Sequence, residues 1–262
     1  MPITCIERVV VAITDLDAAC ERWSKAGFAI ASKRFSAGGL NVARLYAGAI
    51  EIDLVAVAKG VAKAPEPLAS SLERGGGIIG WIWGVSDAAV SDGANSLTLP
   101  LSDGGTRSIS LVNFLPGVWT GSVATDADLA TRRASLKTLC GSNQNTVDFL
   151  EHIVVMTPSL EDAIAAHEKI GLPCKRIREA GGGVRQAFFK LEQTVLEIVG
   201  PGRGTPQAWG FAFMCKDIRR AVDVARANGM QATEPKTAIQ GGKIARIVGP
   251  LDGVAVAYMA PA

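Results

Sequence analysis

The sequence predicts an α+β fold of four similar modules, each with one strand, one helix and three further strands, arranged as two similar halves. Two internal repeats predict it. Residues 6–55 align without a gap on residues 150–199 at an offset of 144, so that Arg8 falls on His152 and Asp53 on Glu197. Residues 80–87 align on 210–217 at an offset of 130. A constant offset across a whole supersecondary unit indicates duplication of that unit.

The elements of the long repeat follow one order in both copies. β-branched runs predict the first strands at Val9–Ile13 and Ile153–Val155. Thr14 and Ser159, with acidic residues close behind, suit helix starts, and Gly27 and Gly171 suit the helix ends. The three remaining strands are expected around 28–35, 40–46 and 49–57 in the first copy and 174–178, 184–190 and 194–199 in the second.

The shorter repeat opens the two remaining modules. The later one continues into a helix over 218–227 and ends on a strand over 254–259, whereas the earlier one leaves little room for a helix and closes with strands near 106–114. A polar helix is expected near 126–139. The expected domains are an N-terminal half over 1–115 (modules 3–58 and 78–115), a connector over 116–149, and a C-terminal half over 150–262 (modules 150–200 and 207–260).

Composition excludes several classes of protein. Net charge is only +2, and no basic run is interleaved with aromatic residues, so a nucleic-acid partner is not expected. The apolar runs are too short to span a bilayer, and the first residues do not read as a signal peptide. Five scattered cysteines, an odd number, favour reduced thiols in a cytoplasmic protein. Whether the chain forms a homodimer is left open.

The third module carries a family pattern. Its first strand reads EHIVVMTPSL, with His152 before the apolar run, and its fourth reads TVLEIVG around Glu197. Paired modules with these strands resemble the vicinal oxygen chelate superfamily, which includes glyoxalase I, extradiol dioxygenases and bleomycin-resistance proteins, and are most similar to its glyoxalase-like branch. The resemblance implies that two modules curl a mixed sheet into a cup-shaped cleft with the helices outside. It also implies that the first-strand histidine and the fourth-strand glutamate point inward and bind a divalent metal.

The ligand set of that family is incomplete in this chain. The first-strand positions of the four modules are Arg8, Gly80, His152 and Gly210, and the fourth-strand positions are Asp53, a residue near Ile109, Glu197 and Ala257. A catalytic zinc site needs three protein ligands, and a non-haem iron site needs two histidines and a carboxylate. No cofactor is therefore assigned. A divalent metal stays open, bound by His152 and Glu197, with Asp53 added if modules one and three share a cup.

Strand alternation assigns the remaining side chains to faces. With His152 inward, Val154 and Met156 also line the cup, while Ile153 and Val155 pack under the helix. Arg8, Glu51 and Asp53 share the inward face of the first copy. Trp81 and Trp83 face the helix layer as core residues, and His167 is expected on a helix surface. Arg185 either gates the cup and binds substrate or lies on the surface.

The predicted function is a glyoxalase-like enzyme that acts on a small, mostly apolar or aromatic oxygenated metabolite by proton transfer, as an isomerase, lyase or hydrolase. His152 acts as the base and Glu197 orients it, because imidazole titrates near neutral pH. Arg8 either binds a substrate anion or forms an internal ion pair with Asp53 or Glu51. Two alternatives stay open: a non-catalytic binding protein of the bleomycin-resistance kind, and a metal-dependent glyoxalase-like lyase with an unusual ligand set.

Overall fold

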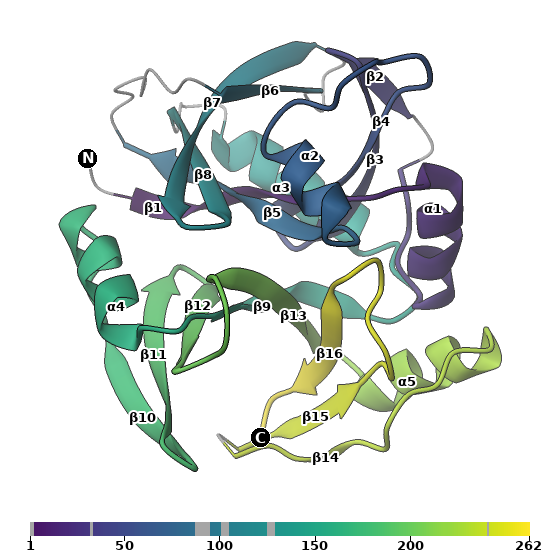
Figure 1. Cartoon of the computed structure of the whole chain (residues 1–262). Coiled ribbons are helices and arrows are strands. Elements are labelled where there is room, and N and C mark those ends of the chain that lie inside the picture. The colour runs from purple at the N-terminus through teal and green to yellow at the C-terminus, as the bar shows by residue number, and fades with distance from the viewer. Residues whose placement is uncertain (1–2, 32–33, 87–94, 101–104, 125–128, 240) are drawn as a thin grey trace.

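The computed structural model describes residues 3–31, 34–86, 95–100, 105–124, 129–239 and 241–262. These residues form two eight-stranded mixed sheets, one in each half, with all the described helices except α2 against their outer faces (Figure 1). The predicted α+β architecture of two similar halves is confirmed. None of the helices in the described ranges combines the length and the apolar character needed to cross a membrane.

The N-terminal sheet has the strand order β2-β3-β4-β1-β5-β8-β7-β6. Its strands are β1 Ile3–Ala12, β2 Phe35–Ala37, β3 Leu40–Ala47, β4 Ile50–Val57, β5 Gly77–Val85, β6 Asn95–Pro100, β7 Thr106–Leu115 and β8 Val118–Ala124. Helix α1, Leu16–Lys25, follows β1, and α2, Leu68–Glu73, lies between β4 and β5. The side chain of Asp15 caps α1 by accepting a hydrogen bond from the Ala18 amide. The sheet thus includes a strand beyond residue 115, where the first half was expected to end.

The C-terminal sheet repeats this order as β10-β11-β12-β9-β13-β16-β15-β14. Its strands are β9 Val147–Met156, β10 Arg176–Gly181, β11 Val184–Leu191, β12 Thr194–Gly200, β13 Gln207–Cys215, β14 Lys236–Thr237, β15 Lys243–Arg246 and β16 Ala255–Ala260. Helix α3, Leu129–Cys140, joins the halves, α4, Leu160–Lys169, follows β9, and α5, Ile218–Ala227, follows β13. Part of the expected polar helix, residues 126–128, lies outside the described residues.

The two sheets settle the module pairing that the sequence left open, and they correct one strand assignment. Modules one and two form the first sheet and modules three and four the second, so Asp53 and His152 lie in different sheets and do not share a cup. The fourth strand of module two is β8, which runs parallel to β5 with Ile82 beside Gly121. The residue near Ile109 instead lies on β7, the third strand of that module. The error arose because residues 86–96 leave little room for a helix, which shifted the strand count by one.

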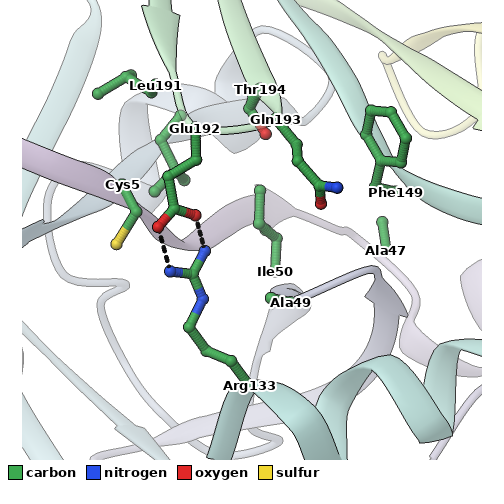
Figure 2. A pocket seen from close by; sticks show the side chains of 11 residues that line it. Cys5, Ala47, Ala49, Ile50, Arg133, Phe149, Leu191, Glu192, Gln193 and Thr194 are labelled. Atoms are coloured by element: carbon green, nitrogen blue, oxygen red, sulfur yellow. Dashed lines mark hydrogen bonds and ion pairs between the residues drawn. The ribbon is translucent and has the colours of Figure 1, made fainter. Parts of the chain in front are cut away.

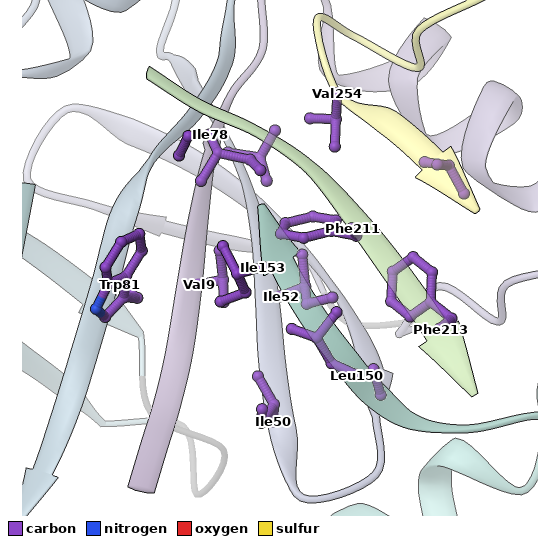
Figure 3. Close-up of a cluster of buried hydrophobic side chains, with 14 of the residues drawn as sticks. Val9, Ile50, Ile52, Ile78, Trp81, Leu150, Ile153, Phe211, Phe213 and Val254 are labelled. Atoms are coloured by element: carbon purple, nitrogen blue, oxygen red, sulfur yellow. The ribbon is translucent and has the colours of Figure 1, made fainter. Parts of the chain in front are cut away.

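The outer faces of both sheets share one apolar core. Val9 and Ile52 from the first half meet Ile153 and Phe211 from the second, as Figure 3 shows. Ile153 and Val155 are fully buried there, as alternation predicts. Burying each such side chain contributes roughly 1.5–3 kcal/mol, so this core holds the halves together.

The tryptophans predicted as core residues also belong to this cluster. Trp81 and Trp83 are 1% and 4% exposed and meet edge to face with ring centroids 5.5 Å apart. The core assignment is confirmed, and neither indole is available to a ligand.

The inner face of the N-terminal half-barrel is closed. Val10, Val55 and Ile82 pack there against Leu97 and Leu111, and Leu68 of α2 joins them. The two edge strands, β2 and β6, touch each other. Hydrocarbon therefore fills the space that would otherwise hold a ligand.

The inner face of the C-terminal half-barrel is open by comparison. Val154, Met156, Met214 and Met259 lie on it and remain partly exposed. Residues 201–206, between β12 and β13, form no helix that could take the place of α2. Of the two half-barrels, the second presents side chains to a ligand.

Candidate functional site

His152 and Glu197 are diagonal neighbours on the inner face of the C-terminal sheet. On the parallel strands β9 and β12, His152 lies beside Val195 and Glu197 beside Val154. The imidazole is buried, at 4% exposure, and the Glu197 side chain is 14% exposed. His152 Nε2 and Glu197 Oε2 are 3.9 Å apart, which is longer than a hydrogen bond. The two atoms therefore lie close together without a hydrogen bond between them.

A β-bulge brings a second carboxylate to His152. Leu150 and His152 pair with the consecutive residues Phe213 and Ala212, which leaves Glu151 as the extra residue of β9. A bulge re-aims side chains relative to strict alternation, and Glu151 Oε2 consequently lies against Nδ1 of His152. This oxygen is buried and has no hydrogen-bond partner among the described residues. Strict period-2 alternation places Glu151 on the face opposite His152, so the contact between the two was not predicted from the sequence.

Glu197 is held by residues of β10 and β11. Gln186 Nε2 donates a hydrogen bond to Glu197 Oε1, and Arg178 Nε donates to Gln186 Oε1 at 2.9 Å. The Arg178 guanidinium carbon lies 5.6 Å from the centroid of the Phe188 ring, which itself lies 6.3 Å from that of His152. None of these three partners was predicted. Cross-strand pairing places Phe188 beside Glu197 and Gln186 beside Val199, a register that the sequence does not state.

Burial sets the charge states of the pair. It lowers the pKa of His152 to about 4, and the positive charges of Lys190 and Arg178 act in the same direction. Burial raises the pKa of Glu197, against the opposing influence of Arg178. At neutral pH the imidazole is therefore uncharged and able to accept a proton.

The corresponding residues of the N-terminal half form a buried ion-pair network. Arg8 Nη1 donates to Asp53 Oδ2 at 2.8 Å, and Arg8 also binds Glu51. Arg44 donates to Asp53 Oδ1 at 2.6 Å and to Glu51 Oε1 at 2.9 Å. All four side chains are buried, and two cations offset two anions. Of the two roles weighed for Arg8, the internal ion pair is the one that the structure contains; Arg44 was not predicted.

Arg185 does not line the C-terminal inner face. On β11, Ala187 and Phe189 belong to the outer core, and Arg185 shares their face, where it binds Glu161 of α4. Of the two positions weighed for Arg185, the surface position is the one that the structure contains.

His167 is also misplaced by the sequence analysis. It is fully buried, stacks on Phe189 at 4.6 Å and contacts the Ala163 carbonyl through Nδ1 at 2.6 Å. It occupies the same helix position as Trp23, which is likewise buried.

The described residues do not fit the divalent metal of the superfamily. Among them, no group of three or more His, Cys, Asp or Glu side chains could hold a metal ion. Ala212 lies opposite His152, and Ala257 lies beside Ala212, and neither side chain can coordinate. The only other histidine of the chain, His167, is in the outer core. We therefore derive no step through a metal.

A small pocket lies at the seam between the halves, away from His152. Cys5, Ile50, Phe149 and Gln193 line it, and a two-bonded ion pair between Arg133 and Glu192 borders it (Figure 2). Burial raises the pKa of the Cys5 thiol to about 12, so the thiol is no nucleophile at neutral pH. Cys5 therefore supplies no nucleophile to this pocket.

Each half thus pairs two modules in one half-barrel, and in each module the first and fourth strands run parallel. This is the vicinal oxygen chelate fold, and two solved structures agree with it. A mutant of 4-hydroxymandelate synthase from Streptomyces coelicolor matches with a TM-score of 0.67 and 13% identity, over 99% of this chain and 93% of that one. A xylose isomerase-like TIM barrel/4-hydroxyphenylpyruvate dioxygenase fusion protein matches with a TM-score of 0.66 and 13% identity, over 99% of this chain and 50% of that one.

These likenesses establish the fold. No family model matches the sequence, and no curated protein matches it significantly. The chemistry must therefore be argued from the site itself.

Proposed function

We propose that the inner face of the C-terminal half-barrel is the active site of a glyoxalase-like enzyme that transfers a proton on a small, mostly apolar or aromatic oxygenated metabolite. The observation that carries this proposal is the neutral imidazole of His152, whose Nε2 faces Glu197 at 3.9 Å on an open face. Val154 and Met156 supply apolar surface beside it.

The two carboxylates give the imidazole a defined role. Glu151 lies against Nδ1, which leaves Nε2 as the nitrogen that a substrate can reach on the inner face. A substrate C–H or O–H that lies on the inner face beside Nε2 gives its proton to Nε2, and the bonding electrons stay on the substrate as an enolate or alkoxide. The imidazolium then returns the proton to another atom of the substrate, as in an isomerase, or to a departing group, as in a lyase. In a hydrolase the proton comes from a water molecule, whose oxygen attacks the substrate, and the imidazolium gives it to the departing group. Glu197 stabilises the transient imidazolium.

An oxygenase reaction is not proposed for this site. A non-haem iron centre of that kind uses two histidines and a carboxylate. His152 has no second histidine on its face of the sheet, because His167 lies in the outer core. A cytoplasmic location is part of the proposal, and the five free cysteines support it.

Binding without chemistry is the second candidate. The observation that favours it is the internal chain from Arg178 through Gln186 to Glu197, which satisfies one oxygen of the carboxylate before any ligand arrives. A sequestering protein would need the open face but not the proton acceptor.

The test is proton exchange in D2O. Carbonyl and hydroxy compounds with an apolar or aromatic group are incubated with the protein, and deuterium incorporation and product formation are followed by 1H NMR. We expect His152→Gln to slow exchange by about 10²-fold or more, and Glu197→Gln to slow it by about tenfold. Arg185→Gln, on the other face of the sheet, is the matched control and should retain the rate.

Two outcomes would decide against catalysis. A rate unchanged in His152→Gln would refute the assigned base. Saturable ligand binding with no exchange in any compound, indifferent to both changes, would establish the sequestering protein.

A further inference from the structure

Positive side chains outnumber negative ones on the inner face of the C-terminal half-barrel. Strand register places five cations on this face: Arg176, Arg178, Lys190, Lys236 and Arg246. None of the five forms an ion pair with a described carboxylate, whereas outward-facing cations of this half such as Arg185 do. The carboxylates of the same face are Glu151 and Glu197, and His152 is neutral. The face therefore attracts an anion.

Arg178 is the cation nearest the proton-transfer pair. Its Nε and Nη2 both bond to the single oxygen Oε1 of Gln186, and no described group accepts a hydrogen bond from Nη1. Its guanidinium stacks near Phe188, and that ring also contacts His152. β10 and β12 are two strands apart, or about 10 Å, and an arginine side chain spans much of that distance. An anion on Arg178 would lie a few bonds from a carbon held at His152.

Trp209 supplies an apolar wall on the same face. It is the extra residue of a bulge in β13, since Val155 pairs with Ala208 and Val154 with Gly210. Its counterpart at the offset of 130 is Ile79, which lies in the cluster that fills the N-terminal half-barrel. Trp209 has no such filling to pack against and is 46% exposed. A flat apolar group would bury it.

We infer that the ligand of this half-barrel is a monocarboxylate with an apolar, preferably aromatic, body: the carboxylate binds Arg178, and the body lies between Phe188 and Trp209. An arginine fork matches a carboxylate. A phosphate dianion would meet stronger repulsion from Glu197 and Glu151 than a monoanion does. The inference names the substrate class of the site proposed above and rests on that proposal.

The experiment compares charged and neutral probes of one shape. Binding of benzoate, phenylacetate, benzamide and phenyl phosphate is measured by calorimetry and by the change in tryptophan fluorescence. We expect the carboxylates to bind at least tenfold more tightly than benzamide, and Arg178→Gln to remove that difference. Arg185→Gln, which changes a cation on the neighbouring strand but on the opposite face, should leave it intact. Trp209→Ala should weaken all aromatic probes alike.

Several results would overturn the inference. These are equal affinity for benzoate and benzamide, indifference of benzoate to Arg178→Gln, preference for phenyl phosphate over both carboxylates, or no saturable binding of any carboxylate. Failure of the proposed enzyme looks different. Carboxylate binding that depends on Arg178 but is accompanied by no proton exchange would remove the catalytic role of His152 and leave the ligand class standing.

Discussion

His167 should make the stability of the protein depend on pH. Its ring is fully buried between Phe189 and Phe114, with centroids at 4.6 and 4.8 Å, and its Nδ1 contacts the Ala163 carbonyl. Nε2 is buried and has no partner among the described residues. Protonation would therefore place an unpaired charge in the apolar core, and this burial lowers the pKa of His167 to about 4.

The size and sign of the effect follow from that shift. The ordinary pKa of histidine is 6.5, and a difference of one between the pKa values of the folded and unfolded states corresponds to about 1.4 kcal/mol, so the imidazole can account for about 3 kcal/mol. Between pH 6.5 and 4 the unfolded chain binds the proton and the folded chain does not. The free energy of unfolding therefore falls as pH drops through this window, and the loss due to His167 levels off below about pH 4.

Urea unfolding followed by tryptophan fluorescence at several pH values tests this. His167→Phe keeps an aromatic ring in a cage of rings and removes the titrating group. Near pH 7.5 it should cost about 1 kcal/mol through the lost hydrogen bond. On going from pH 7.5 to about pH 4.5, the difference in free energy of unfolding between variant and parent should shift by about 2 kcal/mol in favour of the variant. The carboxylates titrate equally in both proteins and cancel from this difference. A parallel decline of the two proteins, or a native-state NMR pKa near 6.5, would show that the ring is not held neutral by burial.

Three further changes test other parts of the structure. Asp53→Asn strips one carboxylate from a buried network and should lower the free energy of unfolding by about 3–5 kcal/mol; an unchanged urea midpoint would contradict the network. Gly80→Ala would bring a Cβ to 1.7 Å from the Trp119 carbonyl oxygen and should separate β5 from β8, which a large drop in melting temperature would show. Gly141→Ala, whose Cβ would have its nearest atom at 3.1 Å, is the control and should be tolerated. If His152 is the base, the pH dependence of proton exchange should have its inflection near 4, and an inflection near 6.5 would contradict the burial of the imidazole.

The duplication made much of the fold predictable. Constant offsets supplied the modules, and alternation then sorted side chains between faces, so that Ile153 and Trp81 could be assigned to the core before any coordinates. The repeat offset compares one copy with the other, and strand alternation acts within a single strand. Neither signal states which modules share a sheet, so the pairing of module one with module two had to come from the structure.

The site was harder to predict because it depends on departures from regularity. A single extra residue, Glu151, breaks alternation next to the histidine, and no propensity marks it. Arg178 and Gln186 reach Glu197 through cross-strand register, which the sequence does not specify. One miss was avoidable: His167 sits at the repeat position of the buried Trp23, and that equivalence already favoured a core location.

The filling of the N-terminal half-barrel by α2 and its apolar neighbours has a consequence for stoichiometry. A duplicated chain invites the expectation of two equivalent sites and of cooperativity between them. Here the N-terminal half-barrel is filled with side chains and has a structural role only. Binding should therefore saturate at one ligand per polypeptide and follow a hyperbolic curve without cooperativity.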